Sequence, residues 1–170
     1  MRVYRGSVPQ LSEEIVKALL DLKLIETESR REVVLDVQSV FTSYLEAERE
    51  AGDQAKEQIR MGRFGEHELA RVRKIAAEKR GIKVGDEAID FLLDQVIEIL
   101  LHSQHVEEVF AEDHELRRTM RPVLRKHMET DQTVEAEVRG RLKHMQEGTR
   151  NWEVEYQRVK EEIQRRKGLS

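Results

Sequence analysis

The sequence predicts an all-α protein, either a helical bundle or two packed helical-hairpin repeats with pseudo-twofold character. Apolar residues recur every three or four positions along nearly the whole chain, which is the period of an amphipathic helix. Charged residues make up 38% of the 170 residues and aromatic residues only 5%, a balance typical of long surface helices and not of β-sheets. Only two prolines interrupt this pattern.

Two helices are expected in the first part of the chain. An apolar stripe over 11–22 predicts the first helix, and a longer stripe over 33–59 predicts the second. Between them, Ser29 and Glu32 have the spacing of a capping box, in which both side chains accept hydrogen bonds from free backbone N–H groups. Glycines within 61–65 then predict a break.

Four further segments complete the predicted architecture. A short basic helix is expected over 69–80, and the segment 86–101 predicts the most apolar helix and therefore the centre of the core. The pattern over 116–145 predicts another helix, with Pro122 either kinking it or lying near its start. A narrow apolar seam over 152–163 predicts a C-terminal amphipathic helix.

The two halves of the chain match each other at an offset of 81 to 83 residues. EIVKALL at 14–20 aligns with QVIEILL at 95–101, and apolar positions of the following helices align as well. Such matches predict two diverged copies of one helical unit that pack on each other. The expected organisation is a first repeat unit over 1–60, a basic connecting helix over 61–84, a second repeat unit over 85–147 and a C-terminal helix over 148–170.

Four segments carry a resemblance to a known family. They are MRVYRGSVP at the start, GDEAIDFLLDQ at 85–95, HVEEVFAEDHELRR at 105–118 and EGTRNWEVEYQRV at 147–159. Together they resemble the bacterial family known as domain of unknown function 507, over nearly the whole chain. The resemblance implies a small bacterial helical protein, and it brings no catalytic residues with it.

Composition also limits the classes of function. The chain has no cysteine, which excludes disulfides, thiol catalysis and cysteine-ligated metals. No apolar run approaches the length of a membrane span, and the first residues lack the apolar region of a signal peptide. We therefore expect a cytoplasmic protein that does not bind membranes. The formal net charge of −4 does not by itself suggest a nucleic-acid partner.

One group of side chains has metal-ligand chemistry. Glu98, His102 and His105 are spaced to share a helix face, and Glu107 or Glu108 follows closely. The alternative is a helix end at which the imidazoles cap free carbonyl groups. We favour this alternative, because a metal site in a helical bundle needs ligands from facing helices. No metal and no cofactor are predicted.

Charge is distributed unevenly along the second half. Residues 85–115 hold ten Asp and Glu and no Lys or Arg, whereas 116–128 hold five basic residues and no acid. The basic residues are Arg117, Arg118, Arg121, Arg125 and Lys126. They form either a surface for nucleic acid or an acidic partner, or the ion-pair partners of Glu87, Asp90, Asp94 and Glu98. We predict mostly ion pairing, with Arg118 and Lys126 left free.

Two aromatic residues and one glycine-rich segment complete the candidates. Trp152 and Tyr156 either seal the core, which we favour, or anchor a partner protein. GIKVGD at 81–86 lacks the Lys-Ser/Thr of a phosphate-binding loop, and no activated nucleophile is recognisable. We therefore expect a non-enzymatic interaction or assembly factor that binds a protein partner or itself, with no small-molecule ligand. The alternative is a nucleic-acid or ribonucleoprotein accessory protein that contacts phosphates through basic helix faces.

Overall fold

The computed structural model describes residues 2–170 and confirms the all-α prediction. Its six α-helices are α1 (Val8–Asp21), α2 (Arg30–Arg60), α3 (Leu69–Lys79), α4 (Ala88–His102), α5 (Asp113–Arg141) and α6 (Arg150–Arg166). Short 3-10 turns η1 (Arg5–Ser7), η2 (Glu66–Glu68) and η3 (Gly85–Glu87) precede α1, α3 and α4, and the two strands are β1 (Ile25–Glu26) and β2 (Glu108–Val109). Within residues 2–170, no helix is long and apolar enough to cross a membrane.

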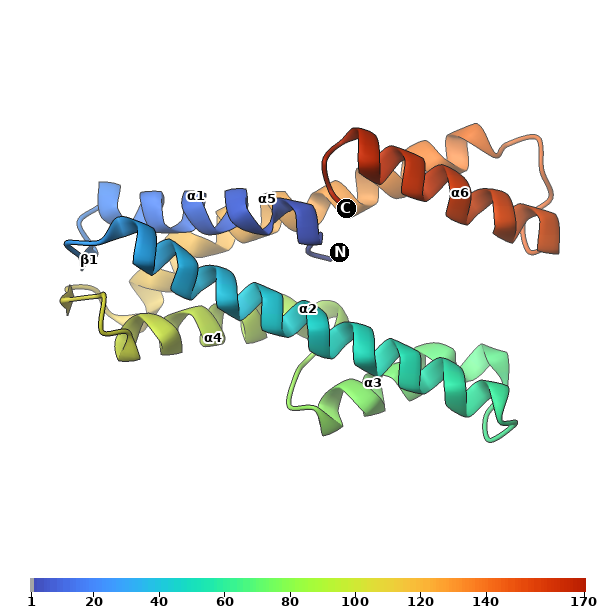
Figure 1. Cartoon of the computed structure of the whole chain (residues 1–170), viewed down its shortest axis with the longest axis horizontal. Helices are drawn as coiled ribbons and strands as arrows, with labels where there is room; N and C mark the ends of the chain where they lie inside the picture. The colour runs from blue at the N-terminus through green and yellow to red at the C-terminus, as the bar shows by residue number, and fades with distance from the viewer. Residues whose placement is uncertain (1) are drawn as a thin grey trace.

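Four of the helices form a bundle around the main hydrophobic core. Helix α1 packs against α2 and α5, and α4 packs against the same two helices (Figure 1). At one end of the bundle β1 pairs antiparallel with β2, so that Ile25 lies opposite Val109. Between α1 and α5, Glu14 Oε2 lies 2.8 Å from His127 Nε2, and this hydrogen bond lowers the pKa of Glu14.

At the other end of the bundle the molecule divides into two arms. Helix α2 continues beyond the bundle and packs against α3, and α5 continues and packs against α6. Figure 1 shows the α2–α3 arm and the α5–α6 arm separating from each other. The α5–α6 arm has its own apolar cluster, formed by Tyr4, Val134, Val138, Leu142, Val159, Ile163 and Leu169. The chain therefore builds a closed four-helix base that carries two helical hairpins.

The order of elements is the same in both halves of the chain. The series α1, β1, α2, α3 is followed by α4, β2, α5, α6, and each half ends with a helix that folds back on the long helix before it. Helices α3 and α6 therefore occupy corresponding positions, although their segments showed no sequence match. Duplication of one ancestral unit remains a prediction.

Helix starts and interruptions differ in part from the expectation. Ser29 precedes α2, but its side chain makes no capping hydrogen bond, so the predicted capping box is wrong. The Thr27 hydroxyl accepts the Ser29 N–H instead, at 2.9 Å. A capping box is present at the start of α5, between Glu112 and Glu115. Pro122 lies inside α5, since this helix begins nine residues earlier.

Helix α4 lies at the centre of the main core, as its sequence predicts. Leu92 and Val96 are fully buried and Leu100 is 1% exposed. Ile99 is only half-buried, because the α4 face that carries it is incompletely covered. Leu101, the next residue after Leu100, is 58% exposed. Two neighbouring leucines of one helix thus have opposite environments.

We expect Leu100→Ala to lower the free energy of unfolding by about 2–5 kcal/mol, because the truncation removes apolar contacts and leaves a cavity. The matched control is Leu101→Ala, which should change stability by less than about 0.5 kcal/mol, as is usual at exposed positions. Urea unfolding of the two variants and the wild type measures the difference. Equal losses in both variants would show that α4 is not the core helix.

Candidate functional site

The segment formed by residues 2–7 lies at the base of the two arms and contacts both. Val3 is buried in the main core, and Tyr4 is buried in the apolar cluster of the α5–α6 arm. The Tyr4 hydroxyl donates a hydrogen bond of 2.6 Å to Asp131 Oδ1 of α5. Burial, followed by this hydrogen bond, raises the pKa of Tyr4. Successive side chains of the segment thus join the bundle to one arm.

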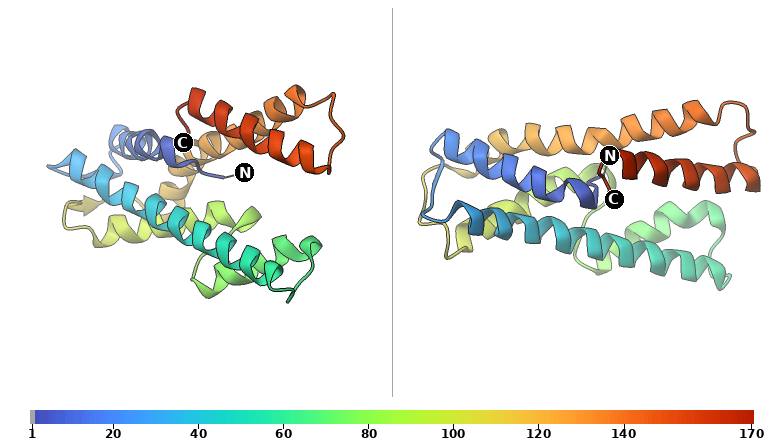
Figure 2. Two further views of the ribbon diagram at one scale, coloured as in Figure 1. Left: turned by 45° about the vertical axis from the view of Figure 1, so that its right-hand side comes forward. Right: turned by 45° about the horizontal axis from the view of Figure 1, so that its top comes forward.

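The chain that follows α6 packs against the same segment. The Gly6 N–H donates a hydrogen bond of 3.0 Å to the Leu169 carbonyl. A Cβ atom on Gly6 would lie 2.3 Å from the carbonyl oxygen of Gly168, which is a backbone clash. Residue 6 is therefore a glycine because the backbone after α6 passes directly over it. Figure 2 shows the two ends of the chain close together at this place.

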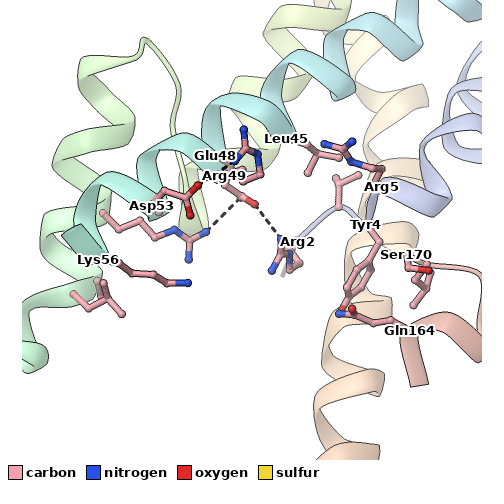
Figure 3. Close-up of a pocket in the computed structure, with 16 residues that line it drawn as sticks. Arg2, Tyr4, Arg5, Leu45, Glu48, Arg49, Asp53, Lys56, Gln164 and Ser170 are labelled. Carbon is pink, nitrogen blue, oxygen red and sulfur yellow. Dashed lines mark hydrogen bonds and ion pairs between the residues drawn. The ribbon is translucent and has the colours of Figure 1, made fainter. Parts of the chain in front are cut away.

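A cleft opens between the arms beside this segment, and we call its larger cavity the first lobe. Its volume is about 550 Å³, and it lies between the α2–α3 arm and the end of α6 (Figure 3). Apolar side chains form part of its wall: Val3, Leu45, Leu69, Ala70 and Leu169. A second lobe of about 540 Å³ adjoins it and extends toward Tyr44 and η3. Both lobes share Arg2, Glu48 and Arg73.

The carboxylate of Glu48 is the buried charge of the cleft. Its side chain is 8% exposed, and it lies 3.4 Å from the guanidinium of Arg2 and 3.6 Å from that of Arg73. A buried carboxylate needs such partners, because removing a charge from water is costly. The three side chains come from the N-terminal segment, α2 and α3, so one ion-pair group joins three parts of the chain. Burial and the nearby Glu48 carboxylate raise the pKa of Tyr44.

The two lobes differ in charge. The first lobe is lined by five cations and two side-chain carboxylates: Arg2, Arg5, Arg49, Lys56 and Arg73 against Glu48 and Asp53. The second lobe is lined by three cations and four carboxylates: Arg2, Arg73 and Lys74 against Glu48, Asp86, Glu87 and Asp131. Positive charge therefore gathers in the first lobe, where the residues come from η1, α2, α3 and the N-terminal segment.

The basic helix face of α5 that the sequence indicated is partly occupied. Arg117 contacts both Asp94 and Asp113, and Arg121 Nη2 lies 2.6 Å from Asp90 Oδ1. These contacts raise the pKa of Arg117. The predicted pairing between α4 and α5 is thus present at these two arginines. Arg118 and Lys126 are exposed and form no ion pair with another residue of the described chain. Arg125, for which pairing with the acidic stripe of α4 was expected, is also exposed and forms none, so that part of the prediction is wrong.

The candidate metal ligands do not converge on one point: Glu98 Oε1 lies 3.6 Å from His102 Nδ1, but His105 faces another helix. His102 Nδ1 is 2.8 Å from the backbone carbonyl of Glu98, in the position of a helix-end cap. His105 Nε2 lies 3.8 Å from Glu32 Oε2 on α2. Within the described residues, no group of three His, Asp or Glu side chains is arranged to hold a metal ion. Glu107 accepts a hydrogen bond from the Glu28 backbone N–H.

Trp152 and Tyr156 stack on each other in α6, with ring centroids 5.0 Å apart. Both are half-buried against the apolar cluster of the α5–α6 arm. The Tyr156 hydroxyl donates a hydrogen bond to Glu135, and burial, followed by this bond, raises the pKa of Tyr156 to about 12. The guanidinium of Arg139 lies 5.9 Å from the Trp152 ring centroid. Tyr156 thus contacts α5 through its hydroxyl group, and Trp152 lies beside the guanidinium of an α5 arginine.

Sequence reasoning did not identify the cleft. Its residues are far apart in the chain. Arg73 belongs to the predicted basic helix over 69–80, but Arg2 and Lys56 are ordinary charged residues in their local context. One signal was available: Glu48 lies four residues after Tyr44 and three before Ala51, inside the apolar stripe of α2. An acidic residue at a core position indicates a buried ion pair.

The fold and the cleft define a two-armed helical bundle with a charged cavity at the base of its arms. The model of the family described as "Protein of unknown function (DUF507)" matches residues 1–169. The chain belongs to this family, which confirms the resemblance seen in the sequence. No match was found among curated proteins.

We expect Gly6→Ala to lower the free energy of unfolding by about 1–3 kcal/mol, since the added methyl group forces backbone apart. Gly52→Ala is the matched control: nothing lies within 4 Å of a Cβ there, and its position inside α2 predicts a gain of about 0.5–1 kcal/mol. Urea unfolding and amide hydrogen exchange of α6 measure both effects. Unchanged exchange in α6 of the Gly6→Ala variant would contradict the close backbone packing.

Proposed function

We propose that the protein is a non-enzymatic interaction or assembly factor that binds a partner protein in the cleft between its two arms. The observation that carries this proposal is the pair of adjoining lobes, of about 550 and 540 Å³, at the base of the arms. Elsewhere in the bundle, apolar side chains are packed into a continuous core. The concave surface thus lies between the arms, whereas the interior of the bundle is filled by side chains.

The lining of the cleft favours a polypeptide over a small molecule as its occupant. Small-molecule sites are mostly apolar and bury most of their ligand. Here the side chains of Arg2, Arg5, Arg49 and Arg73 are 41–66% exposed while they line the first lobe. Long, exposed cations beside apolar side chains are typical of a protein–protein contact with an apolar centre and a charged rim.

We expect Ala70→Trp to weaken partner binding about tenfold or more, because Ala70 lines both lobes and a large neutral ring there would obstruct the place where they meet. The matched control is Ala136→Trp, at an exposed alanine of α5 that lines neither lobe. The partner is first captured from the source cells, identified and purified, and its affinity for each variant is then measured by calorimetry. Equal affinity for Ala70→Trp and wild type would reject the cleft as the binding site.

A second candidate function is supported by the open cations of α5. Arg118 and Arg125 are seven residues apart, so they share one helix face, and Lys126 is adjacent to that face. Since they have no ion-pair partner within residues 2–170, they are free to contact phosphate groups. Nucleic-acid binding of this kind depends on released counterions and therefore weakens steeply as salt rises.

For this second function, we expect an Arg118→Glu, Arg125→Glu variant to lose affinity for a single-stranded oligonucleotide about tenfold or more at low salt, if phosphates bind this face. Arg117→Glu, Arg121→Glu is the comparison, because those arginines already contact α4. Fluorescence anisotropy at low and moderate salt gives the affinities. Absence of salt-dependent binding by the wild type would exclude this candidate.

A further inference from the structure

We infer that the first lobe binds an acidic segment of a partner protein, one whose carboxylates are interspersed with apolar side chains. This inference rests on the proposed function and names the chemistry of the partner. The structural basis is the coincidence, in one cavity, of five cationic side chains with an apolar wall. Neither the second lobe nor the smaller cavity beside Arg5, Val8 and Pro9 combines these two features to the same extent.

The positive charge of the first lobe is only partly neutralised within the protein. The Glu48 carboxylate is the ion-pair partner of two arginines, Arg2 and Arg73. Two other cations of the lobe share the carboxylate of Glu46: Arg5 lies 3.6 Å from it and Arg49 lies 2.5 Å from it. Asp53 adds one contact of 3.0 Å to Arg49 Nη1. Three carboxylates thus face five cations, and a net positive charge remains for an external anion.

Lys56 is the cation with no partner of its own. It is exposed on α2 and forms no ion pair with another described residue. Figure 3 shows its side chain extending from α2 toward the open space in front of Arg2. An ammonium group in this position offers three donors to an incoming carboxylate.

The two arginines that hold Glu48 keep donors available for a second carboxylate. A guanidinium has five N–H donors, while Arg2 and Arg73 each approach Glu48 through one nitrogen, at 3.4 and 3.6 Å. The side chains of Arg2 and Arg73 are 44% and 41% exposed, so part of each is open to the cleft, whereas the Nε of Arg73 is buried and is not accessible to a partner. A partner carboxylate that bridges Arg2 and Arg73 would therefore add hydrogen bonds without displacing Glu48.

Apolar side chains beside the cations determine the rest of the partner's chemistry. Leu69, on the α3 side of the lobe, is 37% exposed. Ala70, which also lines the lobe, is exposed, whereas Leu45 and Leu169 are each 8% exposed and Val3 is buried. Covering this surface with an apolar side chain of the partner removes it from water, which stabilises the complex. A purely acidic segment would leave these contacts unused.

The features of the first lobe favour a protein over a nucleic acid. Base recognition in single strands uses exposed aromatic rings as stacking platforms, and the only aromatic residue of this lobe, Tyr4, is 4% exposed. Carboxylates and guanidinium groups, in contrast, match each other in planar two-point contacts. The second lobe is less suited to an acidic segment, since its carboxylates outnumber its cations.

The test measures binding of a fluorescein-labelled synthetic peptide in which glutamate alternates with leucine, using the full chain and fluorescence anisotropy. We expect binding that weakens with salt and that falls about tenfold or more in Lys56→Glu, because charge reversal repels the peptide. Lys56→Gln should give a smaller loss in the same direction. Lys74→Glu, an exposed lysine of the second lobe alone, is the matched control and should change the affinity less than about threefold.

Three outcomes would overturn the inference. These are equal binding of a matched lysine–leucine peptide, an equal loss in Lys56→Glu and Lys74→Glu, and tighter cleft-dependent binding of a single-stranded oligonucleotide than of the acidic peptide. Circular dichroism checks that the three variants, which change two exposed lysines, keep their helices. The Ala70→Trp test separates the two proposals: if it abolishes partner binding while Lys56→Glu does not, the cleft binds a partner whose chemistry is not acidic.

Discussion

Tyr4, Gly6 and Arg2 lie within five residues of the chain, yet each contacts a different part of the fold. Tyr4 is inserted in the apolar cluster between α5 and α6, Gly6 supports the backbone after α6, and Arg2 approaches Glu48 of α2. The segment therefore fixes the position of both arms relative to the bundle. The cleft exists because this segment occupies the base of the arms without filling the space between them.

Glu48 shows why this arrangement is specific. A carboxylate that is 8% exposed is destabilising unless cations compensate it. Arg2 and Arg73 supply this compensation from opposite directions, so the N-terminal segment and α3 are both drawn to the same point of α2. Most other ion pairs of the protein are exposed, for example Lys17 with Asp21. Such pairs contribute about 0–1 kcal/mol each, and they orient helices more than they stabilise them.

Much of the architecture could be predicted from local patterns. The period of apolar residues located the helices, and the continuous apolar run over 86–101 identified α4 as the core helix. The opposed charges of 85–115 and 116–128 predicted contact between α4 and α5, which is present at Arg117 with Asp94 and at Arg121 with Asp90. These patterns succeed because each depends on residues a few positions apart on one helix. The capping box at Ser29 is absent: the Ser29 N–H donates to the Thr27 hydroxyl and not to Glu32, and the Glu32 N–H donates to the Ser29 carbonyl and not to its hydroxyl.

The sequence by itself determined the helices, the identity of the buried faces and the family, because these follow from the order of side chains along the chain. Only the tertiary structure decided that α2 and α5 extend beyond the bundle as two arms, and that Arg2, Glu48, Lys56 and Arg73 surround one cavity. Their grouping depends on how three separate segments cross in space. The direction of each arm follows from packing at its base, where the backbone after α6 rests on a residue that has no side chain.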